Sequence, residues 1–187
     1  MYAKVPNHQR NISLSTRYGE ERRMYSGSVL GEGRAIHDGG DLQMAEVDDV
    51  DGLIERYNLA QHELVNGNPE PLKEIYSHRD DVTLANPFGP LVRGWDRAAQ
   101  AIEGSASNYR DGEIVGFENV AKYVTPELAC IVEMERYRAK VGGGEDISPV
   151  TLRVTSIFRP EDGTWKIVHR HADPITTPQP AESVIQE

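Results

Sequence analysis

The spacing of the apolar residues changes once along this chain, and that change sets the order of its secondary structure. From Val47 to Ile102, apolar side chains mostly recur every three or four residues, which is the period of a helix. From Ile114 to Ala172 they alternate with polar side chains, as in strands that bury one face. Helices followed by antiparallel strands form the α+β pattern, so we predict about three N-terminal helices packed on one bent sheet.

Turn residues divide these two regions into separate elements. The helical pattern predicts helices over 47–65, 69–76 and 94–102, with a short strand at 82–85 between the second and the third. The alternating region predicts four longer strands, over 114–124, 128–141, 150–159 and 165–172.

Composition along the chain predicts one folded domain with a tail at each end. Residues 1–43 are polar and have no sustained apolar period, so they cannot bury enough surface to offset the entropy of ordering. We predict a disordered tail over 1–43, a single domain over 44–174 and a C-terminal tail over 175–187. A chain of 187 residues is too short for two full domains.

Net charge and cysteine content narrow the class of partner. The net charge of −10 and the pI of about 5.1 oppose binding to nucleic acid or to an anionic membrane surface. The chain has one cysteine, Cys130, so it cannot form an internal disulfide, and we expect a reducing compartment, the cytoplasm. No apolar stretch is long enough to span a bilayer.

Two regions of the chain resemble a known superfamily. The first joins Leu-Ile-Glu-Arg-Tyr at 53–57 to Asn-Pro-Phe-Gly-Pro at 86–90, and the second is Asp-Gly-Thr-Trp-Lys-Ile-Val-His-Arg-His at 162–171. In this order they resemble the nuclear transport factor 2-like superfamily, and in particular its SnoaL-like and ketosteroid-isomerase-like members. The resemblance implies a cone-shaped α+β barrel, in which a strongly bent antiparallel or mixed sheet and the helices enclose a pocket for a small molecule. It also implies a homodimer.

The chain departs from the isomerases at two of three functional positions. The resemblance places Tyr57 where the isomerases have a tyrosine that donates to an oxyanion, but the aspartate that acts as their base falls at Asn86. An amide has no useful basicity near neutral pH. The second isomerase carboxyl falls at about Thr155, so ketosteroid isomerisation by the family mechanism is not expected.

Two histidines near the end of the last strand are the candidate acid and base. Strict alternation predicts that His169 and His171 share a face with Ile167. One could transfer a proton while the other orients it, because the ordinary pKa of histidine lies near neutrality. The alternative is a pair of hydrogen-bonded structural histidines. We see no third ligand for a metal beside them, so no metal site is predicted.

Further candidates for ligand binding come from the strands and from the loop after the first strand. Arg153 and Thr155 share a face of their strand and are both candidates for binding a ligand. Arg153 could clamp a carboxylate or an enolate oxygen, as Asn86 could bind developing negative charge, or it could form an exterior salt bridge. Glu135 is a candidate pocket acid with Arg153 as its partner, although a solvated face is the alternative. Phe88 and Trp95 could form an apolar pocket wall or belong to the core. Tyr57 could bind the ligand or pack in the core.

These residues support two hypotheses from different classes. The first is a SnoaL-like small-molecule pocket protein that acts as a cofactor-independent isomerase, cyclase or dehydratase, using acid–base chemistry on a carbonyl-containing or cyclic metabolite. The alternative is a non-catalytic ligand-binding or homo-oligomeric association module. The residues leave both open, and neither hypothesis requires a cofactor.

Overall fold

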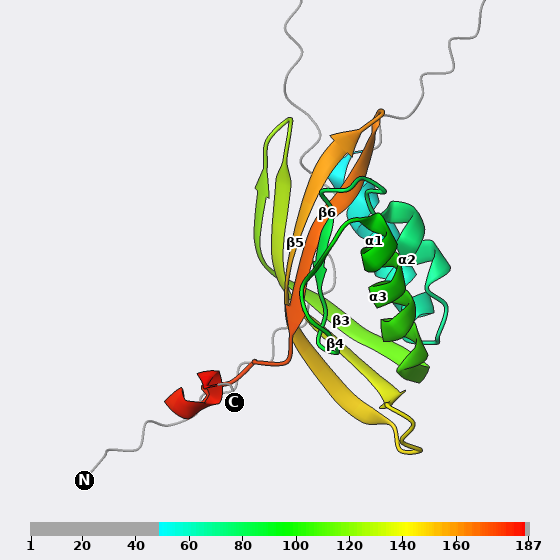
Figure 1. The fold of residues 1–187 in the computed structure, drawn as a ribbon, viewed down its shortest axis with the longest axis vertical. Helices are drawn as coiled ribbons and strands as arrows, with labels where there is room; N and C mark the ends of the chain where they lie inside the picture. The colour runs from blue at the N-terminus through cyan, green and yellow to red at the C-terminus, as the bar shows by residue number, and fades with distance from the viewer. Residues whose placement is uncertain (1–48, 186–187) are drawn as a thin grey trace, which may run out of the picture. The chain divides into compact units, whose positions relative to one another are not determined.

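A computed structural model describes residues 49–185, and its elements follow the predicted order (Figure 1). Three helices are present: α1 (Val50–Leu64), α2 (Glu70–Ile75) and α3 (Trp95–Ser107). Two short strands, β1 (Thr83–Ala85) and β2 (Val92–Arg93), lie between α2 and α3 in the chain. The four long strands are β3 (Tyr109–Val124), β4 (Ala129–Val141), β5 (Ser148–Glu161) and β6 (Thr164–Asp173). The predicted α+β class is confirmed.

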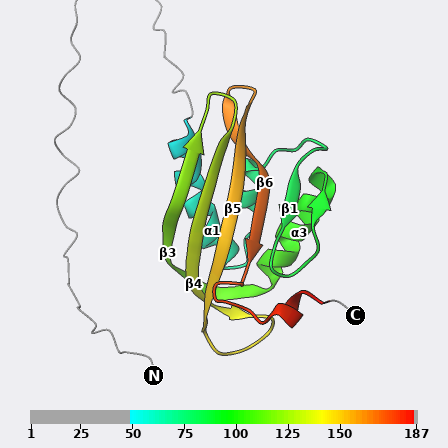
Figure 2. The ribbon, with the colours of Figure 1, turned by 90° about the vertical axis from the view of Figure 1, so that its left-hand side faces the viewer.

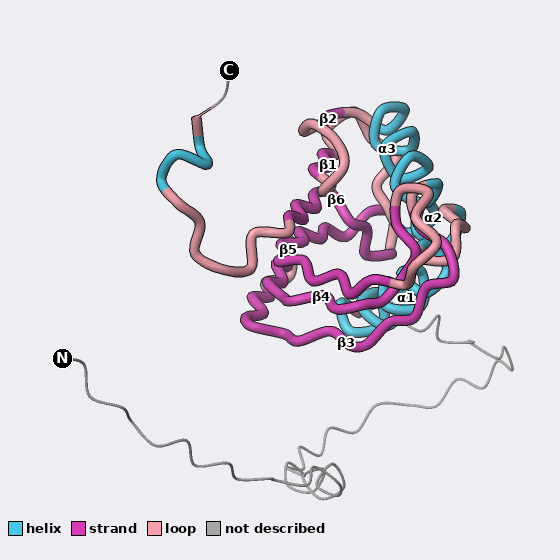
Figure 3. The backbone as a smooth tube through the Cα atoms, turned by 90° about the horizontal axis from the view of Figure 1, so that it is seen from below, coloured by secondary structure: helices cyan, strands magenta, loops and turns pink. Residues whose placement is uncertain are grey.

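The six strands form one mixed sheet in the order β2-β1-β6-β5-β4-β3. All neighbouring strands are antiparallel except β1 and β6, which are parallel. The sheet is strongly curled but open, because β2 and β3 are its two edges (Figure 3). The helices lie against one face, here called the inner face, and Figure 2 looks onto the opposite, outer face of β3 to β6.

The structure describes the two predicted tails to different extents. The N-terminal tail over 1–43 lies outside the described residues. In the predicted C-terminal tail, a single turn of 3₁₀ helix, η1 (Ala181–Val184), follows β6. Within residues 49–185, no helix is long and apolar enough to cross a membrane.

Both ends of α1 are fixed by specific contacts. The side chain of Asp49 accepts a hydrogen bond of 2.8 Å from the backbone N–H of Gly52, which satisfies an otherwise unpaired donor of the first turn. Beyond the last turn, the Asn66 side chain exchanges two hydrogen bonds of 3.0 Å with the backbone of Gly112 on β3. Only glycine fits there, because a Cβ at position 112 would lie 2.4 Å from the carbonyl oxygen of Val65. The helix is therefore held close to the edge of the sheet.

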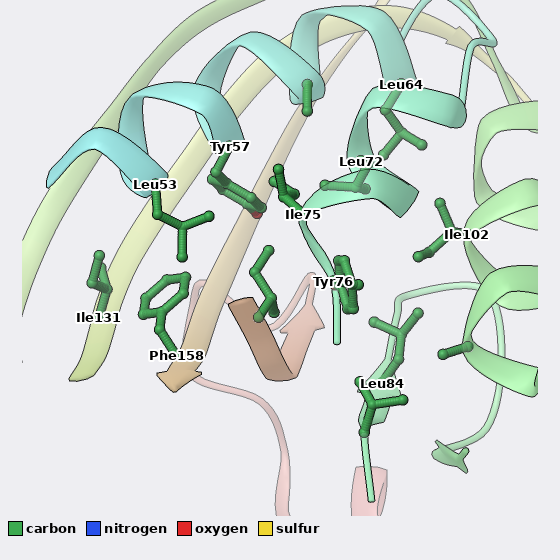
Figure 4. Packing of buried hydrophobic residues seen from close by; sticks show 14 of the residues in the cluster. Leu53, Tyr57, Leu64, Leu72, Ile75, Tyr76, Leu84, Ile102, Ile131 and Phe158 are labelled. Atoms are coloured by element: carbon green, nitrogen blue, oxygen red, sulfur yellow. The ribbon is translucent and has the colours of Figure 1, made fainter. Parts of the chain in front are cut away.

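The buried apolar residues form two clusters along the strands. The helix cluster joins all three helices to the sheet (Figure 4). Its members are Val50, Leu53, Tyr57, Ala60, Leu64, Leu72, Ile75, Tyr76, Val82, Leu84, Ala98, Ile102, Ala106, Ala129, Ile131, Phe158 and Ile167. The sheet cluster consists of Val65, Tyr109, Tyr137, Ala139, Leu152, Val154 and Ala172. Burial of these side chains is the main stabilising contribution to the fold.

A β-bulge interrupts the pairing of β5 with β6. Phe158 pairs with Ile167, but the preceding residue, Ile157, pairs with His169. Val168 is therefore an extra residue on β6. Because a bulge inserts one residue, the side chains on its two sides no longer follow a single alternation.

The bulge changes which residues of β6 lie on the same face of the sheet. Ile167 is fully buried on the inner face, whereas His169 and His171 lie on the outer face, so the prediction that these three residues share a face is wrong. Arg170, which strict alternation places on the face opposite Ile167, instead lies on the inner face and is buried. Because of this one extra residue, Arg170 points toward the helices, and His169 and His171 do not.

Candidate functional site

The inner face of β4 carries two acidic residues among apolar ones. Every second residue of this strand, from Ala129 to Ala139, is buried. Within that series, Glu133 and Glu135 separate Ile131 of the helix cluster from the residues of the sheet cluster. Acidic side chains are almost never this buried unless they are paired or protonated, so the surroundings of both carboxyls have to be examined.

Neighbouring strands extend this polar interruption across the sheet. Ser156 on β5 lies between Phe158 of the helix cluster and Val154 of the sheet cluster, and it pairs with Arg170 on β6. We call Glu133, Glu135, Ser156 and Arg170, together with the hydroxyl groups of Tyr57 and Tyr76, the polar layer. All six of these residues are buried.

Three members of the polar layer form a closed network. The Tyr57 hydroxyl donates to Oε1 of Glu135. Arg170 donates from Nε to the Tyr57 oxygen at 2.8 Å and from Nη2 to Oε2 of Glu135 at 2.7 Å. Burial, and then the nearby carboxylates, raise the pKa of Tyr57 well above its ordinary value despite the opposing charge of Arg170. Tyr57 therefore stays protonated and acts as a donor.

Glu133 stands beside this network without joining it. Burial, and then the charge of Glu135, raise the pKa of the Glu133 carboxyl to about 7, while Arg170 acts in the opposite direction. Within residues 49–185, no hydrogen bond or ion pair engages this carboxyl. A carboxyl that titrates near neutral pH can both accept and release a proton under physiological conditions.

Two further groups of the polar layer lack partners. In the part of the chain that the structure describes, neither the Tyr76 hydroxyl nor the Ser156 hydroxyl meets a hydrogen-bond partner, although both are buried. Buried polar atoms normally have partners, and each exception requires an explanation. Both hydroxyls can donate to or accept from an oxygen atom of a ligand.

A series of aromatic side chains in contact extends from the polar layer to the loop after β1. The hydroxyls of Tyr109 and Tyr137 lie 2.8 Å apart, and their rings meet edge to face at 5.5 Å. The ring of Phe88, which is 43% exposed, packs on Tyr109 at 5.2 Å. Burial raises the pKa of Tyr109, while its hydrogen bond with Tyr137 acts in the opposite direction.

Comparison with known families identifies the domain. The profile of the SnoaL-like domain matches residues 54–176, which run from within α1 to beyond β6 and include all members of the polar layer. The chain belongs to the SnoaL-like domain family. No curated protein sequence matches it.

Solved structures of low sequence identity share the fold of this SnoaL-like domain. A nuclear transport factor 2-like superfamily protein from Salmonella enterica gives a TM-score of 0.58 at 16% identity, over 71% of this chain and 94% of the other. A ketosteroid isomerase-like protein from Erwinia carotovora atroseptica gives 0.57 at 14% identity, over 72% and 99%. A candidate dehydratase of the NTF2-like family from Streptomyces avermitilis gives 0.55 at 20% identity, over 69% and 100%.

The structure brings together only some of the predicted site residues. Tyr57 and Glu135 meet in the polar layer of the SnoaL-like domain, and Phe88 contacts its aromatic border. Asn86 instead organises its own loop, because its Oδ1 accepts from the N–H of Phe88 at 3.0 Å and its Nδ2 donates to the carbonyl of Ala101 at 3.2 Å. Trp95 begins α3, stacks on a surface histidine at 3.8 Å and packs against the helix cluster.

The other predicted residues lie on the outer face of the sheet. His169 shares a hydrogen bond of 2.8 Å with the hydroxyl of Thr83, and His171 lies 3.6 Å from a carboxylate oxygen of Asp173. Nε of Arg153 donates to both carboxylate oxygens of Asp173, at 2.7 and 2.9 Å, so its expected pairing with Glu135 is wrong. Thr155 pairs with His171 on the neighbouring strand and lies on this same face.

The described residues offer few side chains that could hold a metal ion. Among the described residues, no group of three or more histidine, cysteine, aspartate or glutamate side chains is arranged to hold a metal ion. The carboxyls of Glu133 and Glu135 share a face with Arg170 and two tyrosine hydroxyls, a set suited to hydrogen bonding.

Sequence reasoning missed Arg170, Tyr76 and Ser156, and it did not select Glu133. A usable signal was present in β4, where two acids occupy the alternating positions that its apolar residues mark as buried. Two buried acids require a buried cation, and a search of the neighbouring strands for one would have led to Arg170.

Proposed function

We propose that this SnoaL-like domain is a cofactor-independent enzyme that moves a proton on a small carbonyl-containing or cyclic metabolite. The observation that carries this proposal is Glu133, a buried carboxyl without a partner whose pKa is about 7, next to the fixed network of Tyr57, Glu135 and Arg170. A general acid or base works best when its pKa lies near the working pH. Isomerisation and dehydration both begin with such a proton transfer.

Each member of the polar layer has a defined part in this proposal. Glu133 takes a proton from a carbon next to a carbonyl and returns it elsewhere on the ligand. The hydroxyls of Tyr76 and Ser156 bind the carbonyl oxygen, because they are the donors of the polar layer that have no other partner in the described part of the chain. Negative charge that develops on that oxygen is stabilised by these donors and by the positive end of the network at Arg170.

The fold relatives agree with this class of chemistry. Two of the compared structures are described as a ketosteroid isomerase-like protein and as a candidate dehydratase. Their identity with this chain is low, so they support the reaction class by analogy of fold and say nothing about the substrate.

The roles predicted for His169 and His171 remain predictions. Both side chains lie on the sheet face opposite the polar layer, so a catalytic histidine would require a second ligand site on the outer face. The proposal therefore assigns proton transfer to Glu133 and keeps the two histidines as the alternative that the experiment must separate.

A homodimer and a cytoplasmic location also remain proposals. The outer face of β4 to β6 combines partly buried apolar residues, such as Val132 and Met134, with charged ones, such as Arg136. Such a mixed face suits a modest interface between two copies. We expect neither nucleic acid nor membrane as a partner, because the chain is strongly acidic.

The proposal is tested by proton exchange on a simple ketone. The full chain is incubated with 2-tetralone in D₂O, and the loss of the proton signal next to the carbonyl is followed by NMR. Because a positioned acid or base contributes about 10²- to 10⁴-fold, Glu133→Gln should reduce the enzymatic exchange by at least about a hundredfold. Glu113→Gln, which makes the same change at an exposed position of β3, should leave the rate unchanged.

Two outcomes would overturn the proposal. One is exchange that survives Glu133→Gln but is lost in His169→Gln or His171→Gln, which would place the acid or base on the outer face. The other is an exchange rate with the wild-type chain no higher than in buffer, for 2-tetralone and for a panel of other cyclic and open-chain ketones. That result would favour the non-catalytic association module.

A further inference from the structure

The chain continues beyond β6 as a segment that does not pack on its own domain. Every residue from 174 to 185 is exposed, although η1 gives the segment a defined turn. Figures 1 and 3 show it leading away from the sheet on the side opposite the helices. We call residues 175–185 the C-terminal arm. Its position leaves it free to contact a second molecule on the outer-face side of the sheet.

The start of the C-terminal arm is fixed to the outer face. Both carboxylate oxygens of Asp173 accept from Nε of Arg153, and Oδ1 of Asp173 also accepts from the backbone N–H of Ile175 at 2.8 Å. Pro174, whose ring fixes φ, lies between Asp173 and Ile175. Contacts of the folded domain therefore determine the direction in which the arm leaves the sheet.

The C-terminal arm combines stiff, acidic and apolar residues. Pro178 and Pro180 restrict its backbone and favour an extended course. Glu182 is its one charged side chain. Near its end, Val184 and Ile185 are 81% and 73% exposed. Apolar side chains gain stability when a second surface removes them from water, so the end of the arm suits an interface.

The outer face of the sheet offers a surface of the opposite charge. In a chain whose net charge is −10, this face of β4 and β5 carries four basic residues, here called the basic band: Arg136, Arg138, Lys140 and Arg153. Three of them have acidic partners. Arg138 lies opposite Glu113 of β3, but it is exposed and makes no hydrogen bond or ion pair within residues 49–185. It is therefore the charge of the band that an acidic side chain can engage.

The C-terminal arm and the basic band adjoin each other on one molecule. The arm follows Asp173, which pairs with Arg153 of the band. A two-fold axis that brings two outer faces together near this point places the arm of each copy beside the band of the other. An extended chain spans about 3.3 Å per residue and neighbouring strands lie about 4.8 Å apart, so the arm is long enough to cross the band.

We infer that the C-terminal arm packs on the basic band of a second copy of this chain, so that two copies exchange their arms. Glu182 of one copy then faces Arg138 of the other, and the apolar end of the arm covers outer-face residues such as Met134, which lies opposite Arg153. Exchange of an identical segment is a low-cost route to a dimer. This inference rests on the proposed homodimer and is independent of the proposed proton transfer.

Removal of the arm tests whether it contributes to self-association. A chain that ends at Pro174 lacks the arm and keeps β6 intact. Sedimentation velocity over a series of concentrations should give it a dissociation constant at least about tenfold higher than that of the full chain. Val184→Asp should weaken self-association in the same direction. Leu59→Asp, which introduces the same charge at an exposed position of α1, should leave it unchanged.

A pair of charge reversals shows whether the arm contacts the other copy. Glu182→Arg and Arg138→Glu each bring like charges together, so each variant alone should self-associate at least about tenfold more weakly than the wild-type chain. In a dimer of one copy of each variant, both arms meet a band of opposite charge. A one-to-one mixture should therefore restore most of the lost affinity. Far-UV circular dichroism verifies that all variants are folded.

The outcomes separate this inference from the proposed homodimer. A chain ending at Pro174 that self-associates as tightly as the full chain would overturn the exchange of arms and leave the homodimer standing. A mixture of the two charge-reversal variants that associates no more tightly than either alone would also overturn the exchange, because an arm that folds back on its own domain gains nothing from mixing. A wild-type chain that stays monomeric would overturn both the exchange and the homodimer.

Discussion

Two arginine–carboxylate pairs on opposite faces of the same sheet have the same short distance and different surroundings. Arg170 and Glu135 meet at 2.7 Å on the inner face, where their side chains are 7% and 1% exposed. Arg153 and Asp173 also meet at 2.7 Å, but on the outer face, where the arginine is 54% exposed. Contact geometry alone would rank these pairs as equal.

The difference in burial determines what each pair contributes. Water screens the outer pair, and exposed pairs typically stabilise a protein by less than about 1 kcal/mol. The inner pair has lost its hydration, so each charge depends on the other, and removal of one partner leaves the second buried alone. The inner pair therefore fixes the geometry of the polar layer, whereas the outer pair contributes little to stability.

The largest effect is expected from breaking the inner pair. Arg170→Met leaves Glu135 buried without a cation and should reduce the free energy of unfolding by about 3–5 kcal/mol. Arg153→Met makes the same change on the outer face and should cost less than about 1 kcal/mol. Urea unfolding at neutral pH measures both. Equal losses in the two variants would contradict the distinction between the faces.

The second effect concerns the acid that has no partner. The pKa of Glu133 rises from 4.5 to about 7 on folding, so as the pH rises between these two values the unfolded state releases this proton while the native state keeps it, and the free energy of unfolding falls. Glu133→Gln removes this cost and should stabilise the protein by about 3 kcal/mol near pH 8, because a tenfold change in acidity corresponds to about 1.4 kcal/mol.

The pH dependence supplies the control for this second effect. The advantage of Glu133→Gln should shrink as pH falls from 7 to 4.5 and vanish below, because the carboxyl is then protonated in both the folded and the unfolded state. Glu113→Gln, at an exposed position, should show no such dependence. A stability difference for Glu133→Gln that stays constant from about pH 4 to about pH 8 would disprove the assigned pKa.

A third effect comes from the hydroxyl that links the inner pair to α1. Tyr57→Phe removes one donor and one acceptor from the network and should cost about 1–3 kcal/mol in urea unfolding, because Glu135 and Arg170 each lose a buried partner. Tyr123 is 65% exposed on β3, so Tyr123→Phe should be close to neutral. A neutral Tyr57→Phe would show that the network is loosely held.

The smallest effect is expected on the outer face. Burial, and then the charge of His171, lower the pKa of His169. Replacing His171 with glutamine should therefore raise the pKa of His169 slightly, as measured by NMR titration, and leave stability unchanged. A fall in the pKa of His169 would show that the two rings do not interact as the structure indicates.

Alternation and turn residues were sufficient to predict most of the fold. They predicted the three helices, the first short strand and the four long strands, because each of these elements buries a continuous apolar stripe. They missed β2, whose two residues are too few to show a period. The curl of the sheet came only from the resemblance, since periodicity carries no information on how strands bend.

The site was predicted less completely because a single residue altered the pattern. Tyr57 and Glu135 lie on elements of regular periodicity, and both were selected from the sequence. His169, His171 and Arg170 lie beyond the bulge at Val168, where counting by twos gives the wrong face. Nothing in the composition of β6 marks the extra residue, because only the pairing of β6 with β5 shows where the bulge lies.

The division of the interior into two apolar clusters has a consequence for how this domain can change. The helix cluster and the sheet cluster are separated by the polar layer, so substitutions deep within each should act independently, and their free energies should add. The helix cluster alone ties all three helices to the sheet. Apart from Val65, which ends α1, the sheet cluster lies on the strands, and its Tyr109 and Tyr137 border the polar layer. These strand residues can therefore accept new side-chain shapes without loosening the helices. Selection for a different ligand would then act on the sheet cluster while the helix cluster maintains the architecture.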